Sequence, residues 1–86
     1  MDINELISTV KKKIRDNISL EKIDVEDKTF LHKNHESHEI GKFHLKLIIT
    51  SLELKKMNKI ESTKKIYNIL DKELKTYIHS IQILIL

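Results

Sequence analysis

The stretch FHLKLIITS, residues 43–51, is the most strand-like run in this chain of 86 residues. Its side chains alternate between two faces, because successive residues of an extended strand point to opposite sides of a sheet. One face carries Phe43, Leu45, Leu47 and Ile49, and the other carries His44, Lys46, Ile48 and Thr50. The pattern predicts a β-strand with one buried face, and it places His44 on the solvent side.

The chain before this strand predicts one helix and one further strand. Asp2 with Glu5 three residues later is typical of a helix start, since a short acidic side chain accepts hydrogen bonds from the first-turn amides. The apolar residues Ile3, Leu6, Ile7, Val10 and Ile14 then follow at helical spacing. Ile23 and Val25 alternate with charged residues, which indicates a half-buried strand that ends near residues 27–29.

The chain after residue 51 predicts a short helical turn, a longer helix and a last strand. Leu54, Met57 and Ile60 make the turn, and Ile66, Ile69, Leu70 and Leu74 face inward from the longer helix. Ser62 or Glu61 is the expected cap of that helix. The last strand occupies residues 78–86, where His79 has the same parity as Ile81, Ile83 and Ile85. His79 is therefore expected to be partly buried at the edge of the core.

This order of elements predicts an α+β fold with a three-stranded mixed sheet. The first two strands can pair antiparallel, and the last strand most simply joins the sheet in parallel with its neighbour through a right-handed crossover. If that neighbour is the 43–51 strand, both strands begin at the same end of the sheet, and His44 and His79 are expected close together. The segment 30–41 enters the sheet at that same end and carries His32, His35 and His38.

Composition excludes several classes of protein and leaves others open. Without cysteine the chain forms no disulfide and holds no iron–sulfur cluster through its own thiolates. No apolar run approaches the roughly 20 residues that span a bilayer, so a single soluble cytoplasmic domain over residues 1–86 is expected. No nucleophile–base pair or glycine-rich phosphate loop is visible, so we do not expect an enzyme. The net charge of +3 permits nucleic-acid binding without requiring it.

The histidines are the residues with the clearest chemistry. Neutral imidazole is a common ligand of transition metals, and His32, His35 and His38 are spaced by three with Glu36 and Glu39 among them. The alternatives are solvated loop histidines, a structural histidine at position 79, and a histidine-only site for zinc or another divalent ion.

From His44 to His79 the chain resembles the BolA family. Residues 44–51 are similar to that family's Thr-His-Phe-x-Val strand ending in serine, and Ile78-His79-Ser80-Ile81 is similar to its Ile/Val-His-Ala-Leu segment. Residues 25–27 followed by His32 and His35 resemble its acidic strand end and histidine loop. The resemblance implies a helix–strand–strand–helix–helix–strand fold like the class II KH domain, with the helices packed on one face of the sheet.

The resemblance also implies a partner and a cofactor. Proteins of this family share a [2Fe-2S] cluster with a monothiol glutaredoxin, whose cysteine and glutathione supply the thiolates. His79 matches the histidine that the BolA protein supplies to the cluster, and the second ligand is expected from the loop, His32 first and then His35. By this reading the isolated chain is a monomer that binds no cluster, and its role is in iron–sulfur cluster assembly or iron sensing.

The alternative function is a nucleic-acid-binding transcriptional regulator with weak DNA binding. It would use the basic helices, with Lys11, Lys12 and Lys13 in the first and the set Lys55, Lys56, Lys64 and Lys65 after the second strand. The sequence departs from the family here, because Ser62-Thr63-Lys64 replaces its usual Arg-His-Arg and Lys56 replaces its glycine. These departures weaken the case for a KH-type nucleic-acid loop.

Overall fold

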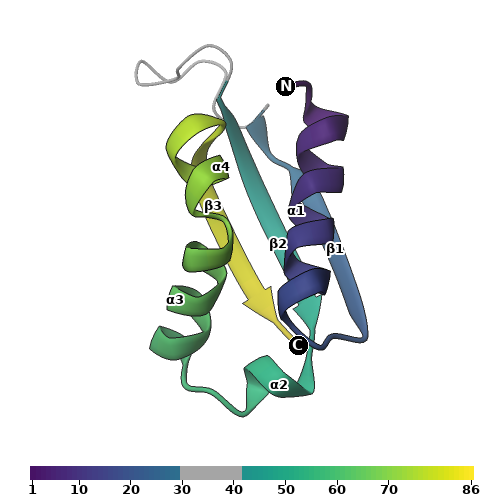
Figure 1. The fold of residues 1–86 in the computed structure, drawn as a ribbon, viewed down its shortest axis with the longest axis vertical. Helices are drawn as coiled ribbons and strands as arrows, with labels where there is room; N and C mark the ends of the chain where they lie inside the picture. The colour runs from purple at the N-terminus through teal and green to yellow at the C-terminus, as the bar shows by residue number, and fades with distance from the viewer. Residues whose placement is uncertain (30–41) are drawn as a thin grey trace.

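The computed structural model describes residues 1–29 and 42–86 and has the predicted α+β fold (Figure 1). Its elements are α1 (Ile3–Asn17), β1 (Lys22–Asp27), β2 (Phe43–Thr50), α2 (Leu52–Lys55), α3 (Lys59–Ile69), α4 (Asp71–Thr76) and β3 (Ile78–Ile85). Among the helices of these two ranges, none combines the length and the apolar character needed to cross a lipid bilayer.

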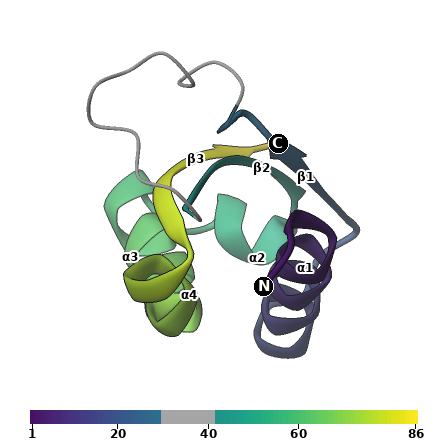
Figure 2. The same cartoon turned by 90° about the horizontal axis from the view of Figure 1, so that it is seen from above.

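The three strands form one mixed sheet in the order β1-β2-β3. β1 pairs antiparallel with β2, and β3 pairs parallel with β2, as the sequence predicted. All four helices lie on the same side of the sheet (Figure 2). β2 lies between β1 and β3 and is the central strand. Its apolar face is turned toward the helices.

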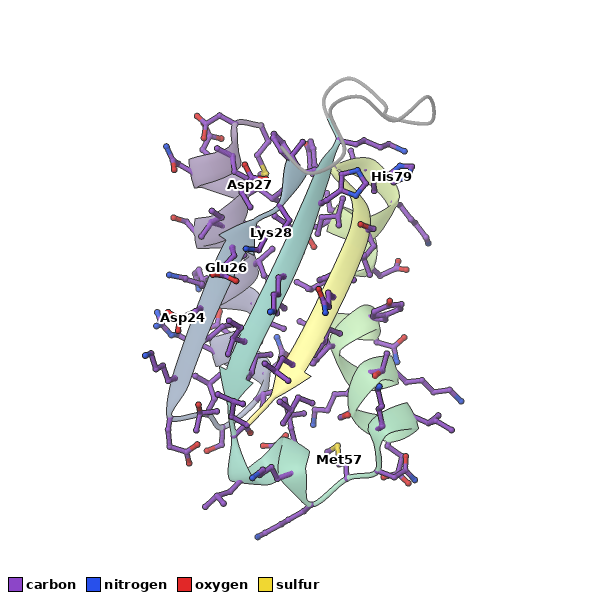
Figure 3. All side chains as sticks on the ribbon, turned by 180° about the vertical axis from the view of Figure 1, so that it is seen from behind. Asp24, Glu26, Asp27, Lys28, Met57 and His79 are labelled. Atoms are coloured by element: carbon purple, nitrogen blue, oxygen red, sulfur yellow. The ribbon has the colours of Figure 1, made fainter. Side chains whose placement is uncertain are left out.

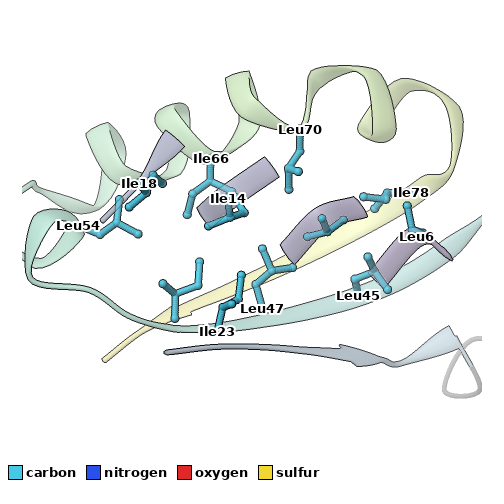
Figure 4. Close-up of a cluster of buried hydrophobic side chains, with 12 residues drawn as sticks. Leu6, Ile14, Ile18, Ile23, Leu45, Leu47, Leu54, Ile66, Leu70 and Ile78 are labelled. Atoms are coloured by element: carbon cyan, nitrogen blue, oxygen red, sulfur yellow. The ribbon is translucent and has the colours of Figure 1, made fainter. Parts of the chain in front are cut away.

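The hydrophobic core lies between this face of the sheet and the helices (Figure 4). Leu45, Leu47 and Ile49 are at most 2% exposed, which confirms that these three residues belong to the buried face predicted for β2. The other buried hydrophobic residues are Leu6, Val10, Ile14, Ile18, Ile23, Leu54, Ile66, Leu70 and Ile78. Burial of these side chains is the main favourable contribution to folding, because each removes apolar surface from water.

Polar caps set the starts of the longer helices. The Asp2 carboxylate accepts a hydrogen bond from the Glu5 amide at 2.8 Å, as predicted, and this hydrogen bond lowers the pKa of Asp2. The prediction for α3 was wrong. Its cap is Asn58, whose side chain accepts from the Glu61 amide at 2.9 Å, while the Ser62 hydroxyl donates to the Lys59 carbonyl inside the first turn.

The longer helix predicted after residue 60 is two helices, because the backbone bends at Leu70. The φ of −99° and ψ of 17° at this residue depart from helical values, so α3 ends before it and α4 begins after it. Leu70 itself is fully buried. Ile60, assigned to the preceding turn by spacing, lies instead in the first turn of α3 and is 69% exposed.

An ion pair that the sequence analysis did not foresee connects α1 to α4. The Lys13 ammonium lies 2.9 Å and 2.7 Å from the two carboxylate oxygens of Glu73, which is only 3% exposed. Burying an unpaired carboxylate costs free energy. The ion pair with Lys13 offsets that cost and allows Glu73 to be buried where α4 packs on the core.

Candidate functional site

The end of the sheet where β2 and β3 begin is held together by backbone hydrogen bonds. The Lys28 amide donates to the His44 carbonyl at 2.7 Å, and the Phe43 amide donates to the Tyr77 carbonyl at 2.9 Å. The residues on either side of segment 30–41 therefore meet the start of β3 at one end of the sheet. This convergence is the geometry that the predicted topology required.

His79 lies at this end of the sheet and is exposed, contrary to the partly buried position that its parity predicted (Figure 3). The cause is an irregularity in the β2–β3 register, where Phe43 pairs with Ile78 but the next residue, His44, pairs with Ser80. His79 is thus an extra residue on β3, as in a β-bulge, and the inward–outward alternation restarts after it. The Ile81, Ile83 and Ile85 side of β3 remains partly buried, as predicted.

His44 is buried, contrary to the prediction that it lies on the solvent side. It is 6% exposed, and its Nδ1 lies 2.6 Å from the Ser80 Oγ in a hydrogen bond. Its ring centroid is 4.9 Å from that of His79, with the two ring planes tilted by 55°. Strand parity correctly placed His44 on the face of β2 that points away from the helices. It could not predict that residues of β3 on that same face, Ser80 and His79, contact the ring.

A sequence signal for this arrangement was present. Ile78 and Ile81 are three residues apart and both face the helices, which a regular strand of period two does not permit. A pair of inward apolar residues at odd spacing indicates a bulge between them, and here that bulge contains His79 and Ser80.

The predicted loop ligands His32 and His35, and also His38, lie outside the described residues. His44 and His79 are the histidines within residues 1–29 and 42–86, and in those ranges no three His, Asp or Glu side chains cluster as a metal site. An exposed imidazole such as that of His79 can present one ring nitrogen to a metal.

Four of the lysines proposed for nucleic acid lie at α2 and α3, and they differ in whether they form an ion pair. Lys55 and Lys56 are exposed at the end of α2, and Lys64 is exposed on α3. The Lys65 ammonium instead lies 2.9 Å from the Glu53 carboxylate. That ion pair neutralises part of the positive surface that the sequence suggested.

A cleft of about 340 Å³ lies next to these lysines, between α2, α3 and the end of β3. Its lining residues are Leu54, Lys55, Met57, Lys59, Ser62, Thr63, Ile83, Leu84 and Ile85. Met57 and His79 mark opposite ends of the sheet in Figure 3. The cleft and the histidine pair are therefore two separate features of the molecule.

The hydrogen bonds of Glu53 predict that the stability of the fold depends on pH. The hydrogen bond from Lys65 and then that from the Ser19 amide lower the pKa of Glu53 below its ordinary value. A lowered folded-state pKa contributes stability above the unfolded pKa, and that contribution is lost as pH falls through the folded one. We therefore expect Glu53→Gln to be less stable than the native chain at pH 7, and the gap to narrow below about pH 4.

Urea unfolding of both chains at a series of pH values measures this gap. The matched control is Glu21→Gln, at an exposed glutamate before β1, which should follow the native curve more closely. A gap for Glu53→Gln that stays constant from neutral to acidic pH would contradict the assigned ion pair.

Comparisons with known proteins agree with this fold. The family model described as BolA-like protein matches residues 14–86. The BolA domain of SufE1 from Arabidopsis thaliana superposes with a TM-score of 0.81 at 21% identity, covering 98% of this chain and 93% of that one. No curated protein matches the chain.

Two further solved structures are similar. BolA1 from Arabidopsis thaliana has a TM-score of 0.75 at 22% identity, covering 92% of this chain and 87% of that one. The BolA1 protein from Mus musculus has a TM-score of 0.74 at 15% identity, covering 92% of this chain and 62% of that one. At such identities the solved structures are evidence for the fold alone.

Proposed function

Because this chain belongs to the BolA family, we propose that it is an accessory protein of iron–sulfur cluster assembly or iron sensing. In this proposal it shares a [2Fe-2S] cluster with a monothiol glutaredoxin in the cytoplasm. His79 supplies one nitrogen ligand, and a histidine of segment 30–41, His32 first and then His35, supplies the other. The role is one of binding, and no catalytic step is assigned to the chain.

The observation that carries the proposal is the exposed imidazole of His79 at the end of the sheet where Lys28 and Phe43 also lie. Two ligands far apart in sequence are brought to one region only if the fold joins their segments there. The hydrogen bonds of Lys28 to His44 and of Phe43 to Tyr77 support the proposal, because they join residues near the two ends of segment 30–41 to the start of β3.

The donor atoms of the chain fit a shared cluster better than a cluster of its own. Iron–sulfur clusters are normally held by thiolates, and the chain has no cysteine. In a joint site the glutaredoxin cysteine and glutathione provide thiolates, while the imidazoles bind the remaining positions. A [2Fe-2S] centre with imidazole in place of thiolate on one iron has a raised reduction potential, which suits transfer or sensing.

The test is to add the native chain to a monothiol glutaredoxin that carries its [2Fe-2S] cluster and to record visible absorption and circular dichroism. A change of ligand on one iron is expected to alter both spectra, and the altered complex should require reduced glutathione. Spectra that equal the sum of the two separate proteins at every ratio would rule the proposal out.

The cleft beside Lys55 favours a second candidate function, the binding of single-stranded nucleic acid. Its lining combines apolar residues with Lys55 and Lys59, so a backbone phosphate has cations within reach. Phosphate contacts of this kind release counterions, and binding then weakens as salt rises.

For this candidate we expect Lys55→Ala to flatten the salt dependence of oligonucleotide binding by about 0.7 in the log–log slope. Fluorescence anisotropy at several salt concentrations measures the slope, with Lys72→Ala on α4 as the control. The absence of binding even at low salt would dispose of this function.

A further inference from the structure

His44 connects three segments of the chain at the end of the sheet where His79 lies. Its amide donates to the Thr29 Oγ1 at 3.2 Å, and its carbonyl accepts from the Lys28 amide at 2.7 Å. Its Nδ1 is hydrogen-bonded to the Ser80 Oγ at 2.6 Å. The end of β1, the start of β2 and the start of β3 are thus joined through one residue.

His44 also packs against the proposed ligand. The His44 side chain is buried, whereas His79 is exposed and has its ring centroid 4.9 Å from that of His44. A tilted contact between two rings at this distance restricts the torsion angles of the more exposed ring. The exposed imidazole therefore has one fixed neighbour, and that neighbour is held by Ser80.

The hydrogen bond between His44 and Ser80 lies at the β-bulge. In the bulge His44 pairs with Ser80 instead of with His79, and the side chains of these same two residues are joined by the hydrogen bond. Together with the buried position of His44, it stabilises the register in which His79 is an extra, outward residue.

We infer that His44, held by Ser80, is a positioning residue that keeps the imidazole of His79 in one orientation for metal binding. This inference rests on the proposed function but concerns the chain before any partner arrives. Groups that orient a metal ligand commonly change metal affinity by about 10-fold to 100-fold when they are removed. Neither His44 nor Ser80 is required to touch the metal.

The first test uses the isolated chain. Three-bond couplings across the Cα–Cβ bond of His79, measured by NMR, report how many staggered rotamers its side chain occupies. The native chain is expected to give the coupling pattern of one rotamer, and Ser80→Ala to give averaged couplings. Ser80 is exposed, so this variant is expected to fold, and His44→Ala tests the same contact from the other side.

Two controls separate orientation from general stability. Ser80→Thr keeps the hydroxyl and should keep the native couplings of His79. Gln82→Ala alters the next outward residue of β3 and should leave those couplings unchanged. Averaged couplings of His79 in the native chain, or equal couplings in native and Ser80→Ala chains, would overturn the inference.

The second test adds cluster-loaded monothiol glutaredoxin to the same chains. The cluster-bridged complex of Ser80→Ala is expected to form about tenfold more weakly than the native one, with Ser80→Thr close to native. If the native chain forms no such complex, the proposed function fails, while the rotamer measurement still decides the orientation of His79. An equally stable complex with Ser80→Ala would overturn the positioning role and leave the proposed function intact.

Discussion

Replacing His79 with alanine is expected to abolish the spectral change that the native chain produces in a cluster-loaded monothiol glutaredoxin. In the proposed function the imidazole supplies one of the two ligands from this chain, and alanine has no atom that can bind iron. Because His79 is exposed, its loss should change the free energy of unfolding by no more than about 0.5 kcal/mol. Visible circular dichroism of the mixture and urea unfolding of the variant measure the two effects separately.

Two further variants determine whether His79 acts as a ligand or only as part of a contact surface. Gln82→Ala removes an exposed side chain from the same strand and should leave the spectral change intact. His79→Cys restores a donor atom as thiolate, so it should again perturb the cluster, with a spectrum different from the native one. If His79→Ala behaves like Gln82→Ala, His79 does not bind the cluster.

Replacing Leu47 with alanine is expected to destabilise the fold by about 2–5 kcal/mol. Leu47 is fully buried on the central strand, where its side chain faces the helices, and truncation leaves a cavity that the surrounding residues fill only in part. For a domain with a stability of about 5–15 kcal/mol, this loss is a large fraction of the whole. Urea unfolding measures the loss of free energy of unfolding, and the slope of that free energy against urea concentration is expected to stay unchanged.

The neighbouring residue in the same strand is the control. Ile48 lies on the opposite face of β2 and is only partly buried, so Ile48→Ala should destabilise the fold by about 1 kcal/mol or less. Equal losses for the two variants would contradict a core that lies on one face of the sheet.

Local patterns in the sequence were sufficient to predict most of the fold. The period of two in β2 identified Leu45, Leu47 and Ile49 as core residues, and each is buried. Asp2 was identified as a helix cap, and its carboxylate accepts a hydrogen bond from the Glu5 amide. Chain connectivity favoured a parallel last strand, because a strand that returns through helices pairs most simply in parallel with its neighbour. Connectivity left open which strand that neighbour is, and the structure places β3 beside β2.

Part of the candidate site was predictable for the same reason. Parallel neighbours begin at one end of a sheet, so the closeness of His44 and His79 required only the topology. Their exposures were predicted in the wrong sense. For His79 the cause is the register between β2 and β3, and for His44 the cause is contact with residues of β3 that enclose its ring. A single extra residue in that register, His79, reverses the alternation on which a parity argument relies.

The sequence by itself determined the class of fold, the central strand and the end of the sheet that carries the histidines, because these follow from short-range periodicity and connectivity. Only the tertiary structure decided that His79 is exposed beside a buried His44, that Leu70 divides the last helical region, and that Lys13 reaches Glu73. Each of these depends on contacts between residues distant in the chain, such as the 60-residue separation of Lys13 and Glu73. Such contacts are selected by packing and register. The spacing of Ile78 and Ile81 indicates the bulge at His79, but no local pattern specifies which residues pack against one another across the fold.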